Sequence, residues 1–278
     1  MFALPSLFIK DSIRTFEFMS LRFVLLSLFL LSSGLGFSQI RLSKLVLDKN
    51  EKYVIRNADV LFIDTLIMGD SSAIILNPQK RDNSIHSKVT IVGYGCVISG
   101  IGESSKNGKN GPAGVDQEGP CVLGKNGGNG SAGTNGHPAN NLFLYFTDLN
   151  ITGSLTINLN GGDGGNGGDG GLGGAGGPGT RVCAGGNGGN GGSGGHGGNG
   201  GHGGTLSIQC KNCPTVRGLI NRSLTVKNYG GYAGNGGTGG FGGPGGLGPL
   251  YDGRNGKTGI AGKDGQAGKN GAINFLSN

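Results

Sequence analysis

The chain has 278 residues, of which 65 are Gly and none is Trp; 6% are aromatic and 14% are charged. Glycine usually makes up about 7% of a protein, so large side chains are too few here for a deep core over the whole length. This composition argues against an ordinary enzyme domain, and we expect no cofactor. The net charge of +7 is dispersed without interleaved aromatic residues, which argues against nucleic acid as a partner.

The N-terminal part of the chain has the features of a secretion signal. Residues 19–38 contain one Arg, an apolar run over 23–31 and small residues up to Ser38. We expect residues 1–38 to be removed on export, with Met19 as an alternative start. The apolar run is short for a bilayer crossing, so no transmembrane anchor is expected. The predicted location is extracellular or at the cell surface.

All five cysteines follow this segment, in a part of the chain where disulfides can form. Their odd number leaves at least one thiol free or intermolecular. Cys210 and Cys213 have the spacing of a metal or redox pair, but the nearby histidines belong to a regular repeat and are interpreted as surface side chains. A local disulfide or plain structural cysteines is favoured, and no metal site is predicted. The cysteines are Cys96, Cys121, Cys183, Cys210 and Cys213.

Residues 39–100 consist of short apolar runs rich in Val and Ile, separated by polar corners such as Asp48, Asn57 and Asp64. Runs of this kind predict strands. Because the corners follow one another too quickly for long hairpins, the pattern favours a β-solenoid, in which each coil stacks on the previous one. A small sandwich is the alternative. Residues 39–100 are therefore predicted to form a β-solenoid-like domain.

Residues 101–278 are dominated by triplets that begin with Gly, and about one residue in three is Gly. A helix with three residues per turn makes no internal hydrogen bonds, so its backbone must bond to neighbouring segments. Glycine on two of its three ridges allows that approach. The triplets predict a bundle of polyglycine II helices, interrupted by strand segments at 141–159 and 206–229; a flexible linker is the alternative. The longest runs are 161–181, 185–205, 230–250 and 253–270.

The third residue of each triplet forms a ridge of side chains. In the first two long runs this ridge is mainly Asn, Asp, Ser and His, and it is expected to face water. The third run has an apolar ridge, expected to pack on the solenoid or on a partner, and the last has a basic ridge, expected at an edge of the bundle. The candidate binding residues are Tyr232, Phe241 and Leu247 on the apolar ridge and Arg254, Lys257, Lys263 and Lys269 on the basic ridge.

Two known groups of proteins resemble these repeats. Runs such as GGDGGNGGDGGLGGAGGPG, between residues 161 and 179, resemble the polyglycine II bundles of glycine-rich antifreeze proteins and phage tail-fibre adhesins. The run GKTGIAGKDGQAGKNG, from residue 256, resembles collagen triplets. The resemblance covers roughly residues 102–271 and rests on composition and period. It implies a layered bundle that binds ice or a cell-surface receptor, and no ligand-binding residue of those families can be matched here.

Catalytic and metal motifs do not gain support from this sequence. Ser193 matches a nucleophile pattern, yet it lies inside a triplet run without the strand and helix that this chemistry requires. We therefore expect a non-catalytic structural or adhesive protein whose partner is an extracellular glycan or an anionic surface; self-association is compatible with this. The alternatives are a soluble ice- or polysaccharide-binding protein and, least favoured, a solenoid enzyme acting on polysaccharide. The carboxylates available to such an enzyme are Asp48, Asp59, Asp64 and Asp70.

Overall fold

A computed structural model describes residues 39–213 and 216–276. The predicted secretion signal, residues 1–38, lies outside the described residues. From Gln39 onward the chain forms one compact unit. Within the described ranges, no helix combines the length and the apolar character that a membrane crossing requires.

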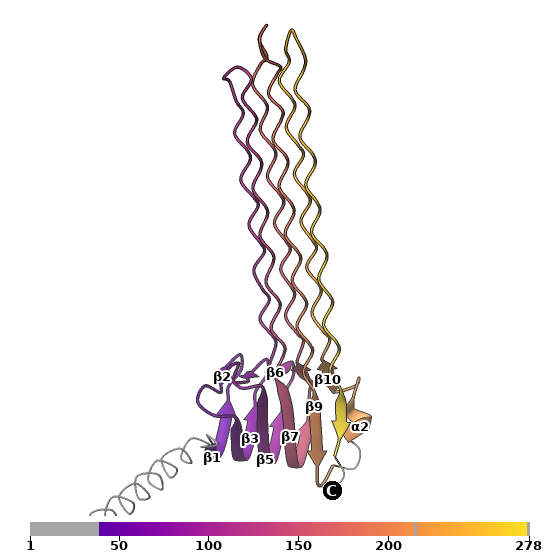
Figure 1. The fold of residues 1–278 in the computed structure, drawn as a ribbon. Helices are drawn as coiled ribbons and strands as arrows, with labels where there is room; N and C mark the ends of the chain where they lie inside the picture. The colour runs from indigo at the N-terminus through magenta and orange to yellow at the C-terminus, as the bar shows by residue number, and fades with distance from the viewer. Residues whose placement is uncertain (1–38, 214–215, 277–278) are drawn as a thin grey trace, which may run out of the picture. The chain divides into compact units, whose positions relative to one another are not determined.

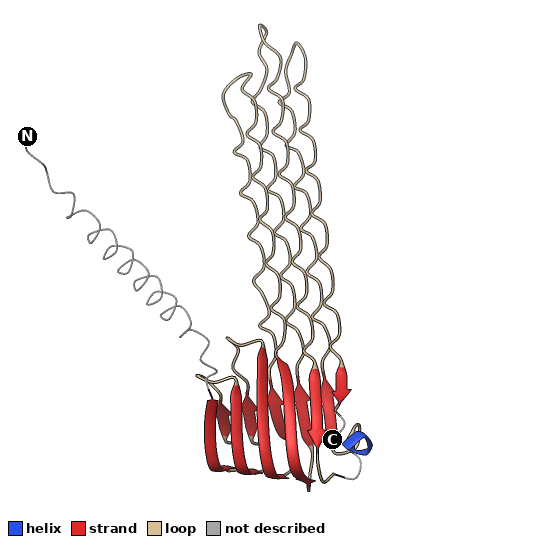
Figure 2. Cartoon of the chain, turned by 60° about the horizontal axis from the view of Figure 1, so that its bottom comes forward, coloured by secondary structure: helices blue, strands red, loops and turns tan. Residues whose placement is uncertain are grey.

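The described residues contain eleven strands in two parallel sheets (Figures 1 and 2). The odd-numbered strands form a six-stranded sheet and the even-numbered strands a five-stranded sheet, each in sequence order. From β3 onward, each strand therefore pairs in parallel with the strand two places before it. The elements are β1 (Gln39–Leu47), β2 (Lys52–Val54), β3 (Val60–Met68), β4 (Ala73–Ile75), β5 (Asp82–Val92), β6 (Cys96–Ser99), β7 (Asn141–Ile151), β8 (Leu155–Asn158), β9 (Leu206–Cys210), α2 (Val216–Leu219), β10 (Leu224–Lys227) and β11 (Ile273–Phe275).

Apolar side chains from both sheets share one core. Leu61 of β3, Leu144 of β7 and Ile157 of β8 are each 0% exposed, because alternate residues of a strand point to the same face. In β3 the alternation shifts by one residue, so Ile63 and Leu66 are both buried while the two residues between them are not. Asp64, expected at a corner, therefore lies inside a continuous strand.

The predicted fold class, short β-solenoid coils interleaved with a polyglycine II helix bundle, is wrong. The regular secondary structure is a sandwich of two parallel sheets, and the one helix with described bounds has four residues. The prediction separated residues 39–100 from the later strands. In the structure β7 pairs with β5 from Asp82 opposite Asn141 to Val92 opposite Ile151, because the apolar faces of distant strands are buried together.

Glycine-rich excursions connect the two sheets and have neither helical nor strand assignment. Each leaves the five-stranded sheet after β6, β8 or β10 and returns to the six-stranded sheet at β7, β9 or β11 (Figure 1). We call their two halves segments and all of them together the glycine array. The segments are 1 (residues 102–117), 2 (124–139), 3 (161–179), 4 (185–204), 5 (229–248) and 6 (253–271).

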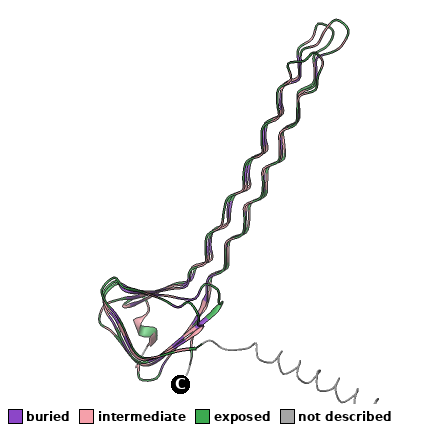
Figure 3. Cartoon of the chain, turned by 90° about the vertical axis from the view of Figure 1, so that its left-hand side faces the viewer, coloured by how far each residue is buried: buried purple, intermediate pink, exposed green. Residues whose placement is uncertain are grey.

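Backbone hydrogen bonds join the segments into two layers (Figure 3). Segments 1, 3 and 5 form the first layer and segments 2, 4 and 6 the second. Within the first layer, Gly108 N–H donates to the Asn166 carbonyl at 2.7 Å and Gly167 N–H to the Asn235 carbonyl at 2.8 Å. Between the layers, Gly192 N–H donates to the Gly171 carbonyl at 2.8 Å. These bonds recur every third residue along each segment.

The close approach of the segments requires glycine. A Cβ at Gly192 would overlap the carbonyl oxygen of Gly128, and a Cβ at Gly128 would lie 2.6 Å from Pro112 Cδ. Real Cβ atoms do not approach so closely, and the obstacle at Gly192 is backbone that other hydrogen bonds hold in place. The array is therefore ordered by main-chain contacts, with side chains left on its outer faces.

Two disulfides are present in the described part of the chain. Cys121–Cys183 joins the far turn of the first excursion to that of the second, and Cys210–Cys213 closes a local loop after β9. The local disulfide confirms the prediction for that pair. Cys96 is a buried free thiol, as the odd cysteine count requires.

Candidate binding surfaces

The outer faces of the array are stabilised by side chains that accept hydrogen bonds from neighbouring backbone. Asn107 Oδ1 of segment 1 accepts from Asn166 N–H at 2.8 Å, and Asn166 Oδ1 accepts in turn from Asn235 N–H of segment 5 at 2.9 Å. Asp163 Oδ1 accepts from Tyr232 N–H at 2.8 Å. The backbone N–H of the third residue in each triplet points outward. The side-chain oxygens of Asn and Asp on the neighbouring segment accept its hydrogen bond, which a glycine has no side chain to do. The recurrence of Asn and Asp at third positions was the signal in the sequence, and its meaning was missed.

Histidines perform the same role in the second layer. His196 Nδ1 accepts from Lys263 N–H at 2.8 Å, and His202 Nδ1 accepts from Lys269 N–H at 2.9 Å. Asn190 Oδ1 accepts from Lys257 N–H between the same two segments. These histidines therefore belong to the hydrogen-bonding pattern of the array. Among the described residues, no three His, Cys, Asp or Glu side chains are grouped to hold a metal ion.

Asp169 is the most strongly engaged of the acceptors in the first layer. Its Oδ1 accepts from the Thr238 backbone N–H at 2.7 Å and from the Thr238 hydroxyl at 2.8 Å. The backbone hydrogen bond, and then the side-chain one, lower the pKa of Asp169 because both favour the ionised carboxylate. Asp169 is thus a charged link between segments 3 and 5.

The predicted apolar residues form an exposed row on segment 5, which we call the apolar row. Tyr232, Phe241 and Leu247 are 80%, 71% and 76% exposed. Phe241 has Leu172 of segment 3, 53% exposed, as its neighbour, because Gly173 N–H donates to the Phe241 carbonyl. The sequence predicted that this row packs on the solenoid or on a partner. In the structure it does not pack on the sheets. It lies on the outer face of the first layer.

The predicted basic residues form a second exposed row, the basic row, on segment 6. The backbone N–H groups of these residues bond to segment 4, as Arg254 N–H does to Asn187 Oδ1 at 2.7 Å. Their side chains lie on the outer face of the second layer, opposite the apolar row. No described segment lies beyond segments 5 and 6, so both rows follow the same edge of the array. The basic row consists of Arg254, Lys257, Lys263 and Lys269.

A shallow groove of about 470 Å³ lies on the outside of the six-stranded sheet. Its centre is one row of paired positions on five neighbouring strands. Three of these side chains stack as rings, with Phe62 4.5 Å from His86 and His86 4.4 Å from Tyr145 between ring centroids. The sequence does not reveal this site, because the three rings come from three different strands. The row is Arg41, Phe62, His86, Tyr145 and Gln209.

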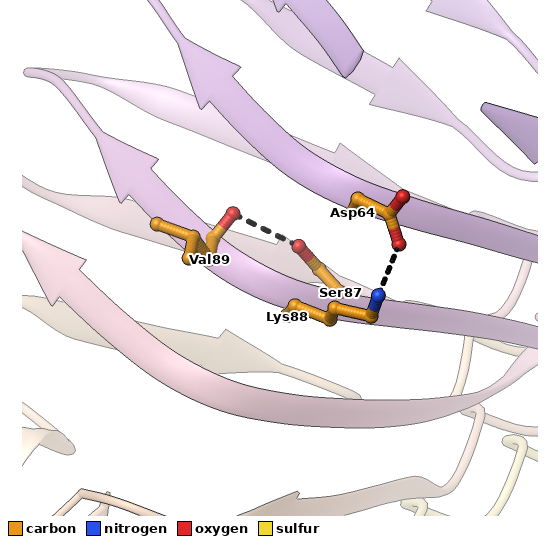
Figure 4. A network of polar contacts seen from close by, with 4 residues as sticks. All are labelled: Asp64, Ser87, Lys88 and Val89. Carbon is orange, nitrogen blue, oxygen red and sulfur yellow. Dashed lines mark hydrogen bonds and ion pairs between the residues drawn. The ribbon is translucent and has the colours of Figure 1, made fainter. Parts of the chain in front are cut away.

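Charged side chains line the groove beside the stacked rings. Lys88 Nζ lies 2.8 Å from Asp64 Oδ1 (Figure 4), and this lysine holds the pKa of the carboxyl below its usual range. On the same strand as Lys88, Ser87 donates its hydroxyl to the Val89 carbonyl at 3.1 Å. Burial lowers the pKa of His86, so its imidazole is neutral near pH 7. The groove therefore has an excess of positive charge, because its lining includes one carboxylate, Asp64, and three basic side chains: Arg41, Lys88 and Lys211.

Three of the residues that the sequence offered for catalysis make structural contacts. Ser193 N–H donates to Asn129 Oδ1 at 2.8 Å within the array. Asp70 Oδ1 accepts from Tyr94 N–H at 2.8 Å, and Asp64 pairs with Lys88. These contacts explain Ser193, Asp64 and Asp70 without assigning them a reaction.

Comparisons with known proteins give little guidance. No protein-family model matches the chain, and no curated protein matches it. Among solved structures, the springtail antifreeze protein from Granisotoma rainieri, described as a bundle of nine polyproline type II helices, is 23% identical. The match covers 65% of this chain and 97% of that chain, with a TM-score of 0.11. At this TM-score the match supports no conclusion about the fold or the function of this chain.

Proposed function

We propose that this protein is an exported, non-catalytic adhesive module that binds an extracellular glycan through the apolar row of the glycine array. The observation that carries the proposal is the exposure of Tyr232, Phe241 and Leu247 on an array whose backbone is held by hydrogen bonds within and between its two layers. Phe241, Pro244 and Leu247 follow one another at the third positions of segment 5, and exposed apolar patches mark interaction sites on soluble proteins.

The rigidity of the array supports adhesion to a repetitive surface. Side chains on one segment recur every third residue, and the hydrogen bonds fix their separation. Several weak contacts at fixed spacing bind a regular polymer much more tightly than one contact does. The two disulfides support an oxidising, extracellular location.

The proposal is tested by sedimenting the full-length protein with insoluble cellulose and chitin particles. The triple variant Tyr232→Ser, Phe241→Ser, Leu247→Ser should reduce the bound fraction by about tenfold, because the apolar contacts are lost. The matched control replaces Arg254, Lys257 and Lys263 by Ser on the opposite face at the same edge, and should bind as the wild type does.

Other outcomes would contradict the proposal in different ways. Loss of binding in the basic-row control, relieved by salt in the wild type, would indicate an anionic surface as the partner. Thermal hysteresis without polysaccharide binding would indicate an ice-binding protein. Failure to bind any of these particles would remove the support for a glycan partner.

A further inference from the structure

We propose that the groove on the six-stranded sheet is a second binding site, specific for a linear anionic oligosaccharide such as a chain of uronic acids. The site lies on the sheets and is separate from the apolar row of the array. Its central row is Arg41, Phe62, His86, Tyr145 and Gln209.

The geometry of the groove favours a linear polymer. Its central positions are paired across five neighbouring strands, from Arg41 on β1 to Gln209 on β9. Neighbouring strands are about 4.8 Å apart, so the row offers evenly spaced contacts over roughly 19 Å. A polymer that lies across the strands meets one new side chain at each strand.

The chemistry of the lining favours a sugar over an apolar ligand. The stacked rings of Phe62, His86 and Tyr145 give the groove an apolar floor. Polar groups border them, including the Thr147 and Gln209 side chains. Sugar rings have C–H groups on their faces and hydroxyl groups around their edges, and binding sites that combine apolar surface with a few polar groups suit such ligands.

The charge of the groove selects an anionic sugar. Arg41, Lys88 and Lys211 line it, while Asp64 is paired with Lys88. His86 adds no charge near pH 7. Arg41 and Lys211 are exposed, so a carboxylate on the ligand can reach Arg41 and form charge-assisted hydrogen bonds. Complementary charge raises both the affinity and the rate of encounter.

The experiment is calorimetric titration of the full-length protein with oligogalacturonides, with cello-oligosaccharides of the same length and with oligoglutamate peptides as comparisons. We expect the oligogalacturonides to bind at least about tenfold more tightly than either comparison ligand. The double variant Arg41→Ala, Lys211→Ala should weaken binding by about tenfold or more, because charge-assisted contacts are lost. The control is Lys44→Ala. Lys44 is on β1 but does not line the groove, so this substitution should not change binding.

The floor of the groove is tested with Tyr145→Leu, which removes one stacked ring and the hydroxyl group. We expect weaker binding at unchanged fold, verified by circular dichroism; if this variant unfolds, the Arg41 and Lys211 variant still decides the matter. Equal binding of oligoglutamate would overturn the specificity for sugar. Absence of binding, or binding that the double variant leaves intact, would overturn the site and show the ring stack to be structural.

Discussion

The sheets and the glycine array reach order by opposite means. In the sheets, Leu61 and Leu144 are buried among other apolar side chains, and the hydrophobic effect compensates for the entropy of ordering. In the array, the absence of side chains lets backbones approach, so that Gly192 N–H bonds directly to the Gly171 carbonyl of the neighbouring segment. The comparison teaches that a missing side chain can be as specific a requirement as a buried one.

The largest expected effect is Gly192→Ala, which tests whether the array depends on close backbone approach. The new Cβ would overlap the Gly128 carbonyl, and that carbonyl cannot move without breaking bonds to neighbouring segments. We expect the free energy of unfolding to fall by about 4 kcal/mol or more, measured by chemical denaturation. The control Ser193→Ala, at the adjacent outward position, should change it by less than about 0.5 kcal/mol. A mild effect of Gly192→Ala would show that the segments can separate locally.

Leu144→Ala tests the sheet region by the usual route of side-chain removal. Leu144 is 0% exposed, so the variant loses apolar contacts and leaves a cavity. The expected loss is about 2–5 kcal/mol, measured by the same denaturation experiment. Val89→Ala on β5, where the side chain is 40% exposed, should cost clearly less. If hydrogen exchange showed faster opening of the sheets alone, the two regions would unfold independently.

A smaller effect is expected for the side chains that complete the outer face of the array. Asn166→Ala removes the acceptor of the Asn235 amide, which can then bond to water. The expected cost is about 1 kcal/mol. Asn166→Asp keeps an oxygen at the same position and should retain most of the stability. Unchanged exchange of the Asn235 amide in Asn166→Ala would mean that this hydrogen bond does not protect the array.

The smallest effect concerns the protonation of Asp169. Its folded-state pKa is lowered by the hydrogen bonds from Thr238, so the ionised form adds stability above its ordinary pKa of 3.8, and this is lost as the pH falls through the lowered value. The unfolding free energy of the wild type should therefore decline slightly more in acid than that of Asp169→Asn. Parallel pH profiles of the two proteins would contradict this role.

The sequence predicted much of the secondary structure but misplaced its boundaries. Val- and Ile-rich runs were correctly predicted as strands, since alternation is a local pattern. The break expected at Asp64 was wrong, because Ile63 and Leu66 are both buried and the strand bends without ending. The sequence did not show that the strands of residues 39–100 share a core with the later strands. The pairing of Asp82 with Asn141 spans a long glycine-rich excursion, and a local pattern does not predict pairing over that distance.

The exposed rows of the array could be predicted from the sequence, whereas the groove could not, because only the rows follow a local repeat. The apolar row and the basic row could be read from the third positions of the triplets, and the structure places both on exposed faces along the edge formed by segments 5 and 6. The groove could not be read, because Phe62, His86 and Tyr145 lie on strands separated by corners and by a whole excursion. The acceptor role of Asn166 and its equivalents was also missed, since it depends on which segment lies alongside.

The sequence by itself determined the strands, the positions where a Cβ would be tolerated, and which side chains share a ridge, because each follows from a repeat of two or three residues. Only the tertiary structure decided that strands from Gln39 to Phe275 form two parallel sheets around one core, that Cys121 bonds to Cys183, and that three stacked rings line a charged groove. Those features depend on which distant segments become neighbours, and that choice is made by burial and backbone hydrogen bonding over the whole fold.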